Sequence, residues 1–168
     1  MSVPLEIERK YVILMPDASL FSEYDGYTVS HIEQTYLDSP AKVTRRVRAR
    51  SYSERTVYTE TKKIRVDSMS ALEDEREIER GEYLALLQEI KEGTTTLRKT
   101  RHTFCYGGQV FEIDVYPEWT KTAILETELP TRETVVEFPD LIRVVKEVTG
   151  DKKYSNAAMA REFPTELI

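Results

Sequence analysis

The chain has 168 residues, of which 24 are basic and 30 acidic, giving a formal net charge of −6. With 40% hydrophobic residues this is the composition of one folded domain over 1–168, and its charge argues against general attraction to nucleic acid or to an anionic membrane. A lone cysteine excludes a disulfide within the chain, and no apolar run approaches the roughly 20 residues of a membrane span. Because the first residues lack the order of a signal peptide, we expect a cytoplasmic protein.

Most of the chain alternates between charged and apolar residues with a period of two, as β-strands with one apolar face do. This pattern predicts about eight strands, over 5–14, 27–37, 42–51, 57–64, 73–80, 96–103, 110–116 and 123–129. Short turns such as Gly107-Gly108 join most neighbours. We therefore predict an antiparallel sheet long enough to close on itself.

Helical spacing and capping residues predict three or four helices, over 18–24, 82–90, 140–148 and 156–163. Asp17 and Ser155 are the expected N-caps, while Gly93 and Gly150 are expected to end the second and third helices. These helices are too few and too short to form a layer of their own, so we expect them at the periphery of the sheet.

The charged faces of the predicted strands are sorted by sign. Basic side chains share a face at Arg46/Arg48/Arg50 and at Lys99/Arg101, and acidic side chains do so at Glu75/Glu77, Glu112/Asp114 and Glu126/Glu128. A solvated outer face crossed by salt bridges is one interpretation, since exposed charged faces are common. An enclosed site with two walls of opposite charge is the other.

The strands over 110–116 and 123–129 follow one another across a short turn, so we expect them to pair. Their carboxylates would then face each other, which is destabilising. A hard divalent cation would relieve this repulsion, and so would basic residues such as Lys10.

If the charged face points inward, arginines on one wall can bind phosphate oxygens in bidentate fashion. The matching guest is a polyphosphate whose metal bridges to the acidic wall, an arrangement that also suits phosphoanhydride hydrolysis. The sequence contains no glycine-rich Walker loop, so side chains would have to hold the phosphates.

Several motifs together resemble the CYTH family, the triphosphate tunnel metalloenzymes. Glu6-Ile7-Glu8-Arg9-Lys10 resembles the ExExK signature of the family, and further similar segments follow in the family's order at Gln34–Asp38, Arg46–Arg48, Thr61-Lys62, Glu75–Glu77, Arg98–Arg101, Phe111–Asp114, Leu125–Glu128 and Asp151–Asn156. The resemblance implies an α+β fold built on an eight-stranded antiparallel closed barrel, the tunnel, which binds a triphosphate with Mg²⁺ or Mn²⁺.

The resemblance also implies roles for individual residues. Metal ligands would be Glu6, Glu8, Glu126, Glu128 and Asp114, with Glu75, Glu77 and Glu112 as possible additional acidic lining. Phosphates would be held by Lys10, Arg46, Arg48, Lys62, Lys99 and Arg101. Tyr36 and Lys62 match the pair that activates water in hydrolytic relatives, since an adjacent ammonium favours the ionised tyrosine; an ordinary strand tyrosine is the alternative for Tyr36.

Five other residues complete the prediction. Glu73 and Asp74 stand where the family usually has an arginine, so the fifth strand is expected to be less basic. We interpret His31 and His102 as structural, because carboxylates already suit a hard cation. Trp119 is interpreted as a packing residue in a turn.

The sequence thus favours metal-dependent hydrolysis of a small-molecule triphosphate, above all inorganic tripolyphosphate to pyrophosphate and phosphate. Alternatives are a class IV-type adenylate cyclase, a thiamine or nucleoside triphosphatase, a non-catalytic polyphosphate-binding module and a structural sheet protein. No nucleic-acid or membrane partner is expected. The oligomeric state is left open, with a homodimer as one option.

Overall fold

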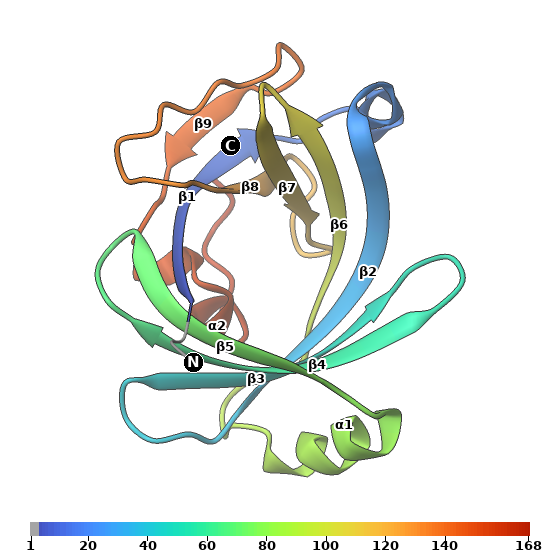
Figure 1. Cartoon of the computed structure of the whole chain (residues 1–168), viewed down its shortest axis with the longest axis vertical. Coiled ribbons are helices and arrows are strands. Elements are labelled where there is room, and N and C mark those ends of the chain that lie inside the picture. The colour runs from blue at the N-terminus through green and yellow to red at the C-terminus, as the bar shows by residue number, and fades with distance from the viewer. Residues whose placement is uncertain (1–3) are drawn as a thin grey trace.

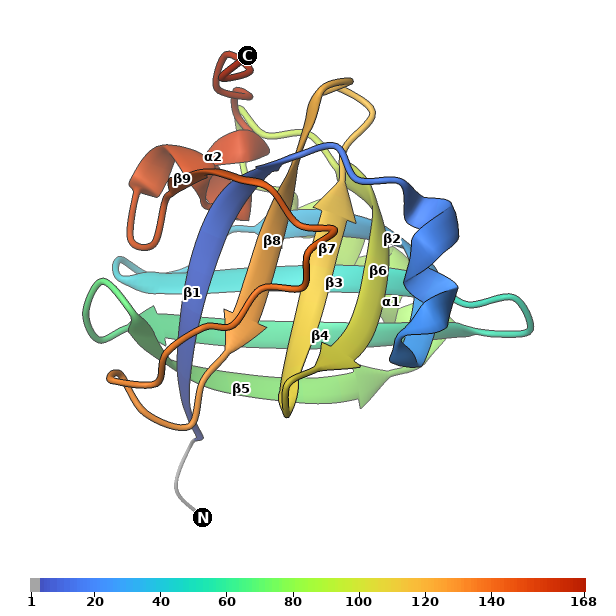
Figure 2. The same ribbon diagram turned by 90° about the horizontal axis from the view of Figure 1, so that it is seen from above.

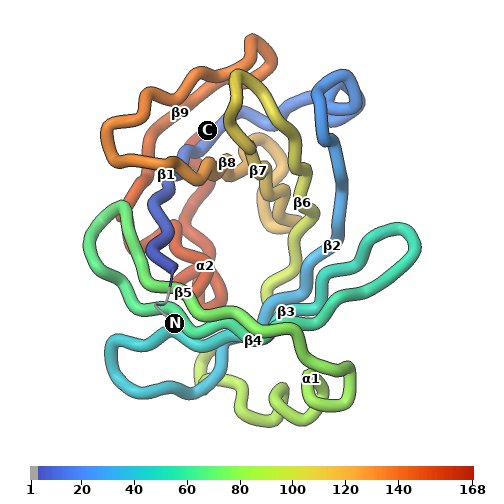
Figure 3. The backbone as a smooth tube through the Cα atoms, in the orientation of Figure 1, coloured from blue at the N-terminus to red at the C-terminus, as the bar shows by residue number. Residues whose placement is uncertain are grey.

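The computed structural model of the protein, which describes residues 4–168, is an antiparallel sheet of nine strands, eight of which close into a ring (Figures 1 and 2). The strands are β1 (Leu5–Leu14), β2 (Asp25–Leu37), β3 (Val43–Ser51), β4 (Thr56–Arg65), β5 (Ser70–Ile78), β6 (Leu97–Tyr106), β7 (Gln109–Val115), β8 (Thr122–Glu128) and β9 (Val144–Glu147). Their order is β5-β4-β3-β2-β6-β7-β8-β1, and β1 returns to β5. The predicted α+β fold with a closed antiparallel sheet is confirmed, and Figure 3 shows the ring in outline.

The ring closes through strand β1, which pairs with three others. On one edge, Glu8 to Leu14 pair with β8. On the other edge, Leu5 to Ile7 pair with β5, and Tyr11 to Ile13 pair with β9. Strand β9 therefore supplies backbone partners to the part of β1 that β5 does not reach.

The helix predicted over 140–148 is wrong, because its centre is the strand β9. The amphipathic pattern came from apolar residues, of which Ile142 and Val148 are buried but lie outside the strand. All four residues of β9 are exposed, so no apolar face marks it as a strand. What places it there is the free edge of β1.

Helical segments are short and peripheral, as expected. They are η1 (Ala18–Glu23), α1 (Arg80–Leu86), η2 (Leu87–Glu89), η3 (Lys152–Tyr154) and α2 (Asn156–Met159). Both predicted N-caps are confirmed: Asp17 accepts from the backbone N–H of Ser19, and Ser155 accepts from that of Ala158. Across residues 4–168, no helix is long and apolar enough to cross a membrane.

Two apolar cores lie on the outer face of the ring. One packs β1, β6, β7 and β8 against η1 and residues 136–142; there Phe111 stacks on Phe104 and the ring edge of Phe138 meets Tyr11. The other packs β2, β3 and β5 against α1 through Leu37, Val47 and Tyr83. These cores use the apolar face of each strand and leave the charged face to the inside.

A third apolar core closes one end of the ring from within. It joins inward-facing strand residues to the C-terminal segment, where Tyr154, Met159 and Ala160 are buried. The strand residues are Val12, Tyr36, Leu97 and Ile124, and Tyr116 directly follows β7. Figures 1 and 3 show α2 within the outline of the ring. The inner face is therefore apolar at this end and charged beyond it.

Trp119 belongs to this third core. Its ring is 5% exposed and packs against Tyr116 and Phe163, while its Nε1 donates to the carbonyl of Pro164 at 3.2 Å. The interpretation of Trp119 as a packing residue is confirmed.

Candidate active site

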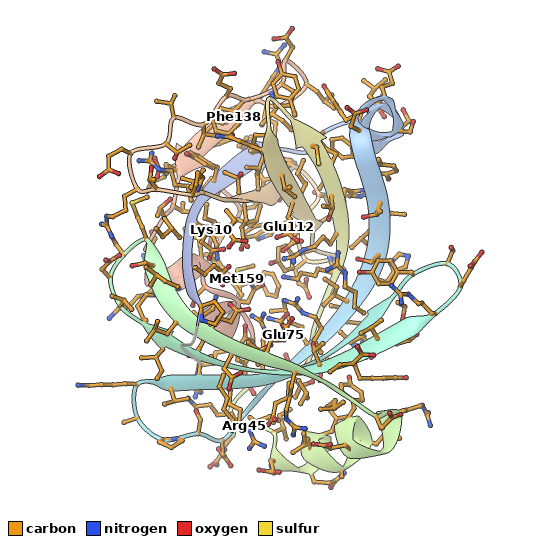
Figure 4. The ribbon with its side chains drawn as sticks, in the orientation of Figure 1. Lys10, Arg45, Glu75, Glu112, Phe138 and Met159 are labelled. Carbon is orange, nitrogen blue, oxygen red and sulfur yellow. The ribbon has the colours of Figure 1, made fainter. Side chains whose placement is uncertain are left out.

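The ring encloses a cavity of about 540 Å³ whose lining is mostly charged. Alternation along each strand turns every second side chain into this cavity. In Figure 4 the side chains of Lys10, Glu75 and Glu112 point into the ring, whereas Arg45 and Phe138 lie outside it. We call this cavity the tunnel.

Strands β1, β7 and β8 form the acidic wall of the tunnel. In the register, Glu8 lies opposite Glu128, Lys10 opposite Glu126, and Glu126 opposite Glu112. The predicted pairing of the strands that carry Glu112 and Glu126 is thus confirmed. Two carboxylates therefore face each other between β1 and β8, and two more between β7 and β8.

Lys10 balances part of this negative charge. Its Nζ lies 3.3 Å from Oε1 of Glu126 and donates to the carbonyl of Tyr154 at 3.0 Å. Although burial raises the pKa of Glu126, Lys10 and Arg101 outweigh it and hold that pKa at about 2. Repulsion from Glu126, followed by burial, raises the pKa of Glu8. The wall therefore keeps negative charge that Lys10 does not neutralise.

Glu6 and Glu73 face each other where β1 meets β5. Burial and the hydrogen bond with Glu73 raise the pKa of Glu6 to about 9, while, against the effect of burial, that hydrogen bond and Lys63 hold the pKa of Glu73 at about 2, so the pair shares one proton. Nζ of Lys63 lies 3.2 Å from Glu73 and 3.8 Å from Glu6. The additional carboxyl group of Glu73 is therefore tolerated, because Lys63 and one proton balance the negative charge of the Glu6–Glu73 pair.

Strand β3 forms the basic wall through Arg46, Arg48 and Arg50. Nε and Nη2 of Arg48 donate to the amide oxygen of Gln34 at 2.9 and 2.7 Å, and Nε of Arg50 donates to Ser30. Nε of Arg46 is buried without a hydrogen-bond partner. Among residues 4–168, none of the three arginines forms an ion pair.

Burial makes the positive charge on this wall energetically unfavourable. Burial, together with the neighbouring Arg46 and Arg101, lowers the pKa of Arg48 to about 9. A buried cation that lacks a carboxylate is unfavourable unless an anion comes to it. The basic wall therefore has both the spare charge and the free donors that an anionic guest would use.

Asp114, a predicted metal ligand, has both of its oxygens engaged by buried cations. Nε and Nη2 of Arg101 lie 2.7 and 2.9 Å from Oδ1 and Oδ2, and Nζ of Lys99 lies 2.8 Å from Oδ2. Asp114 and Lys99 are almost completely buried. Despite burial, which raises the pKa of Asp114, Arg101 and Lys99 hold it well below its usual range. In this structure Asp114, Lys99 and Arg101 form an internal ion-pair set.

Arg101 still reaches the tunnel, where its Nη1 lies 2.9 Å from Glu112. Lys99 lies behind it and contacts the amide oxygen of Asn156 at 3.4 Å. That oxygen also accepts from the hydroxyl of Tyr116 at 2.6 Å. The C-terminal segment is thereby tied to the buried charges.

Tyr36 lines the tunnel and Lys62 does not. The hydroxyl of Tyr36 accepts from Nε2 of Gln34 at 2.7 Å, and Tyr36 raises the pKa of Arg46 against the effect of burial. Lys62 is exposed on the outer face of β4, because the register places Thr61 opposite Arg46 and alternation then turns Lys63 inward. The prediction that Lys62 lines the site is corrected to Lys63.

The remaining predicted residues divide between the tunnel and its surroundings. Glu75 lines the tunnel and accepts from the hydroxyl of Thr61 at 2.8 Å, whereas Glu77 lies beyond the tunnel on exposed β5. His31 and His102 lie outside, bonded to Thr100 and to Tyr27 respectively. Their interpretation as structural residues agrees with this placement.

Sequence reasoning missed several tunnel residues: Arg50, Lys63, Arg65 and Glu73. For Arg50 and Glu73 the signal was present, since each continues the alternation of a charged face already identified. For Lys63 and Arg65 the length of the turn between β3 and β4 was the missing information, because it sets which face of β4 points inward.

The acidic wall fits a hard divalent cation by its donor chemistry. Carboxylate oxygens are the ligands that Mg²⁺ and Mn²⁺ prefer. Glu8, Glu126 and Glu128 together carry more negative charge than Lys10 neutralises. Within the described part of the chain, no three His, Cys, Asp or Glu side chains already converge as a metal centre.

Comparisons with known proteins agree on the fold. No protein-family model and no curated protein matches the sequence. The inorganic triphosphatase NE1496 matches with a TM-score of 0.59 and 27% identity, over 95% of this chain and 96% of that one. PH1819 from Pyrococcus horikoshii matches with a TM-score of 0.56 and 20% identity, over 76% and 80%. HpAC1 from Hippeastrum, a proposed adenylyl cyclase with a dominant triphosphatase activity, matches with 0.51 and 15%, over 76% and 81%.

The two adjacent lysines of β4 provide a matched test of which face lines the tunnel. Lys63→Gln removes a tunnel cation, so we expect it to weaken tripolyphosphate binding about tenfold, the effect of losing one charge-assisted contact. Lys62→Gln makes the same chemical change on the outer face and should leave the affinity unchanged. Isothermal titration calorimetry measures both; equal effects of the two variants would contradict the inward placement of Lys63.

The Asp114 ion-pair set has a consequence for stability without any metal. Asp114→Asn leaves two buried cations without their shared partner, so we expect the free energy of unfolding to fall by about 3 kcal/mol or more. Glu112→Gln changes the partly exposed partner of Arg101 and should cost within about 1 kcal/mol. Urea denaturation in EDTA checks both variants. If Asp114→Asn lost stability only when Mg²⁺ was present, Asp114 would be a metal ligand after all.

Proposed function

Since the chain belongs to the CYTH family of triphosphate tunnel proteins, we propose that it is a metal-dependent triphosphatase acting on inorganic tripolyphosphate. The products would be pyrophosphate and phosphate. The ring of eight strands, with its charged faces turned inward, supplies the enclosed site that this activity needs.

The observation that carries the proposal is the unpaired basic wall opposite a crowded acidic wall. Arg46, Arg48 and Arg50 lack carboxylate partners among residues 4–168, while Glu8 and Glu128 lie directly opposite each other on the far side. A triphosphate would give the arginines their missing partners. A divalent cation held by these carboxylates would relieve the repulsion within the acidic wall.

The tunnel lining favours an inorganic substrate over a nucleotide or thiamine triphosphate. Tyr36 is the single aromatic residue among the described residues that line the tunnel. Tyr52, two residues after Arg50, is covered by Arg50 and Arg55, whose guanidinium carbons lie 5.2 and 5.4 Å from its ring centre. A base or thiazolium ring would therefore find no free aromatic surface here. The 27% identity with the inorganic triphosphatase NE1496, over almost the whole of both chains, supports the same choice.

The proposed mechanism uses the tunnel residues to bind and orient the phosphate chain. Arg46, Arg48 and Arg50 bind the phosphate oxygens, and Lys63 adds a fourth cation. Glu6, Glu8, Glu126 and Glu128 are the residues that would hold Mg²⁺ or Mn²⁺. When bound, the cation would supply charge neutralisation at the phosphoryl oxygens.

Tyr36 is the proposed acceptor of the proton from the attacking water. The oxygen of that water forms a bond to the terminal phosphorus, the bond from this phosphorus to the bridging oxygen breaks, and pyrophosphate leaves with the bond's electron pair. Arg46, rather than the predicted Lys62, is the cation beside Tyr36. Gln34 fixes the position of the tyrosine oxygen through its hydrogen bond.

Substrate preference is the direct test of the proposal. Phosphate release should be at least tenfold faster from tripolyphosphate than from ATP or thiamine triphosphate, should require Mg²⁺ or Mn²⁺, and should stop in EDTA. Faster release from either organic substrate would overturn the substrate assignment. Cyclic AMP and pyrophosphate from ATP would identify a cyclase instead, and tight binding without any release would identify a binding module.

The role of Tyr36 predicts a separation of turnover from affinity. Tyr36→Phe removes only the hydroxyl, so we expect kcat on tripolyphosphate to fall about a hundredfold, the usual size of a general-base contribution, with little change in KM. Tyr27→Phe removes a hydroxyl bonded to His102 outside the tunnel and serves as the control. Unchanged turnover in Tyr36→Phe would remove this tyrosine from the mechanism.

A further inference from the structure

Two hollows lie beside the tunnel, around the connection between β2 and β3 that is seen at the lower left of Figure 1. Their volumes are about 360 and 240 Å³. Both are lined by Ser39, Val43, Thr44 and Lys91, so they form one continuous depression. We call it the outer groove.

All charged side chains that line the outer groove are basic. They are Lys42, Arg45, Lys63, Arg65, Lys91 and Arg161. The chain as a whole carries a net charge of −6, so this is a local reversal of its average charge. A surface of one sign attracts the opposite sign over a distance of about a Debye length.

Most of this positive charge is not used within the protein. Arg45 is neutralised by Glu60 and Glu89, and Lys63 contacts Glu73. The other four cations of the groove form no ion pair with any residue between 4 and 168. They are Lys42, Arg65, Lys91 and Arg161.

The groove is held by backbone hydrogen bonds rather than by mobile side chains. The N–H of Lys91 donates to the carbonyl of Tyr36 at 2.9 Å, and the N–H of Asp38 donates to the carbonyl of Glu89 at 3.0 Å. The N–H of Thr95 donates to the carbonyl of Ala160 at 2.9 Å, which joins the opposite wall. The cations are therefore presented on fixed elements, one of which carries Tyr36 itself.

Lys42 occupies an unusual backbone position at the tip of the β2–β3 connection. Its φ of 70° lies in the left-handed region, where glycine or asparagine is preferred and lysine is disfavoured. Packing offers no reason for a lysine here, because the side chain is exposed. A lysine at this disfavoured position is consistent with a role of its charge in binding an anion.

The outer groove opens into the tunnel. Thr44, Lys63 and Arg65 line both the tunnel and the larger hollow, and Tyr36, Thr44 and Ala157 line both the tunnel and the smaller one. We propose that the outer groove binds the distal phosphates of a linear inorganic polyphosphate longer than tripolyphosphate, while its first three phosphates occupy the tunnel. This inference rests on the proposed function for the tunnel part of the chain.

The chemistry of the groove suits a phosphate chain. Each added phosphate brings about one further negative charge, whereas an organic triphosphate ends in a neutral or aromatic group. Lysine ammonium groups act as point charges without a fixed geometry, so they tolerate a flexible chain in several registers. Arg65 and Arg161 can add bidentate contacts to the phosphate oxygens.

The test compares the binding of tripolyphosphate and of a medium-chain polyphosphate by isothermal titration calorimetry in EDTA, where no turnover occurs. The variant is Lys42→Asn with Lys91→Gln. Asparagine accepts the left-handed backbone, so loss of binding cannot come from strain at position 42. The control is Lys121→Gln with Lys146→Gln, which removes the same charge from exposed residues that line neither hollow.

The wild-type protein should bind the longer chain more tightly than tripolyphosphate, and the difference should shrink as salt is added. The groove variant should lose about fivefold to tenfold in affinity for the longer chain, as expected for two partly solvated contacts, and less than twofold for tripolyphosphate. No preference for the longer chain, or equal losses in variant and control, would overturn the groove. If the wild type hydrolysed no triphosphate but the variant still lost affinity for the longer chain, the proposed function would fall and the groove would stand.

Discussion

The enclosed charges of the tunnel are the constraint on which the rest of the structure depends. Closing the ring turns seven basic and eight acidic side chains toward one space. Burying charge is unfavourable unless it is paired, and the near balance of the two signs makes the closure possible. Only some of these charges form direct ion pairs. Asp114 pairs with Arg101 and Lys99, whereas the tunnel arginines of β3 have no carboxylate partner among residues 4–168. One wall of the tunnel therefore keeps unpaired positive charge, and the other keeps unpaired negative charge.

The sequence was sufficient to predict the eight strands of the ring and their charged faces, because both follow from local alternation. It even predicted that Glu112 and Glu126 would face each other, since consecutive strands joined by a short turn pair with each other. The inward face of β4 could not be predicted in this way. Lysines occupy both faces at positions 62 and 63, so the pattern alone carries no preference, and the register against β3 decides between them.

Two other features depended on partners distant in the chain. Strand β9 has no buried residue of its own and exists because β1 offers it a free edge, which no local pattern reveals. Asp114 is one of several acids on a charged face, and only its position opposite Arg101 in β6 makes it an ion-pair centre. Local sequence therefore fixes which face is charged, whereas register fixes which charges meet and which stay available.

The third apolar core, here called the plug, explains why the unpaired charges of the tunnel stay available. Because α2 and the residues around it fill one end of the ring, β1, β2, β6 and β8 change from apolar to charged or polar lining along their length. Tyr36 stands at this change, packed in the plug on one side and bonded to Gln34 beside the arginines on the other. A tyrosine held by a core has little freedom to move, and a phosphate chain entering from the charged end would stop against it. The same packing that stabilises the ring thereby sets the depth at which a reacting phosphorus would lie.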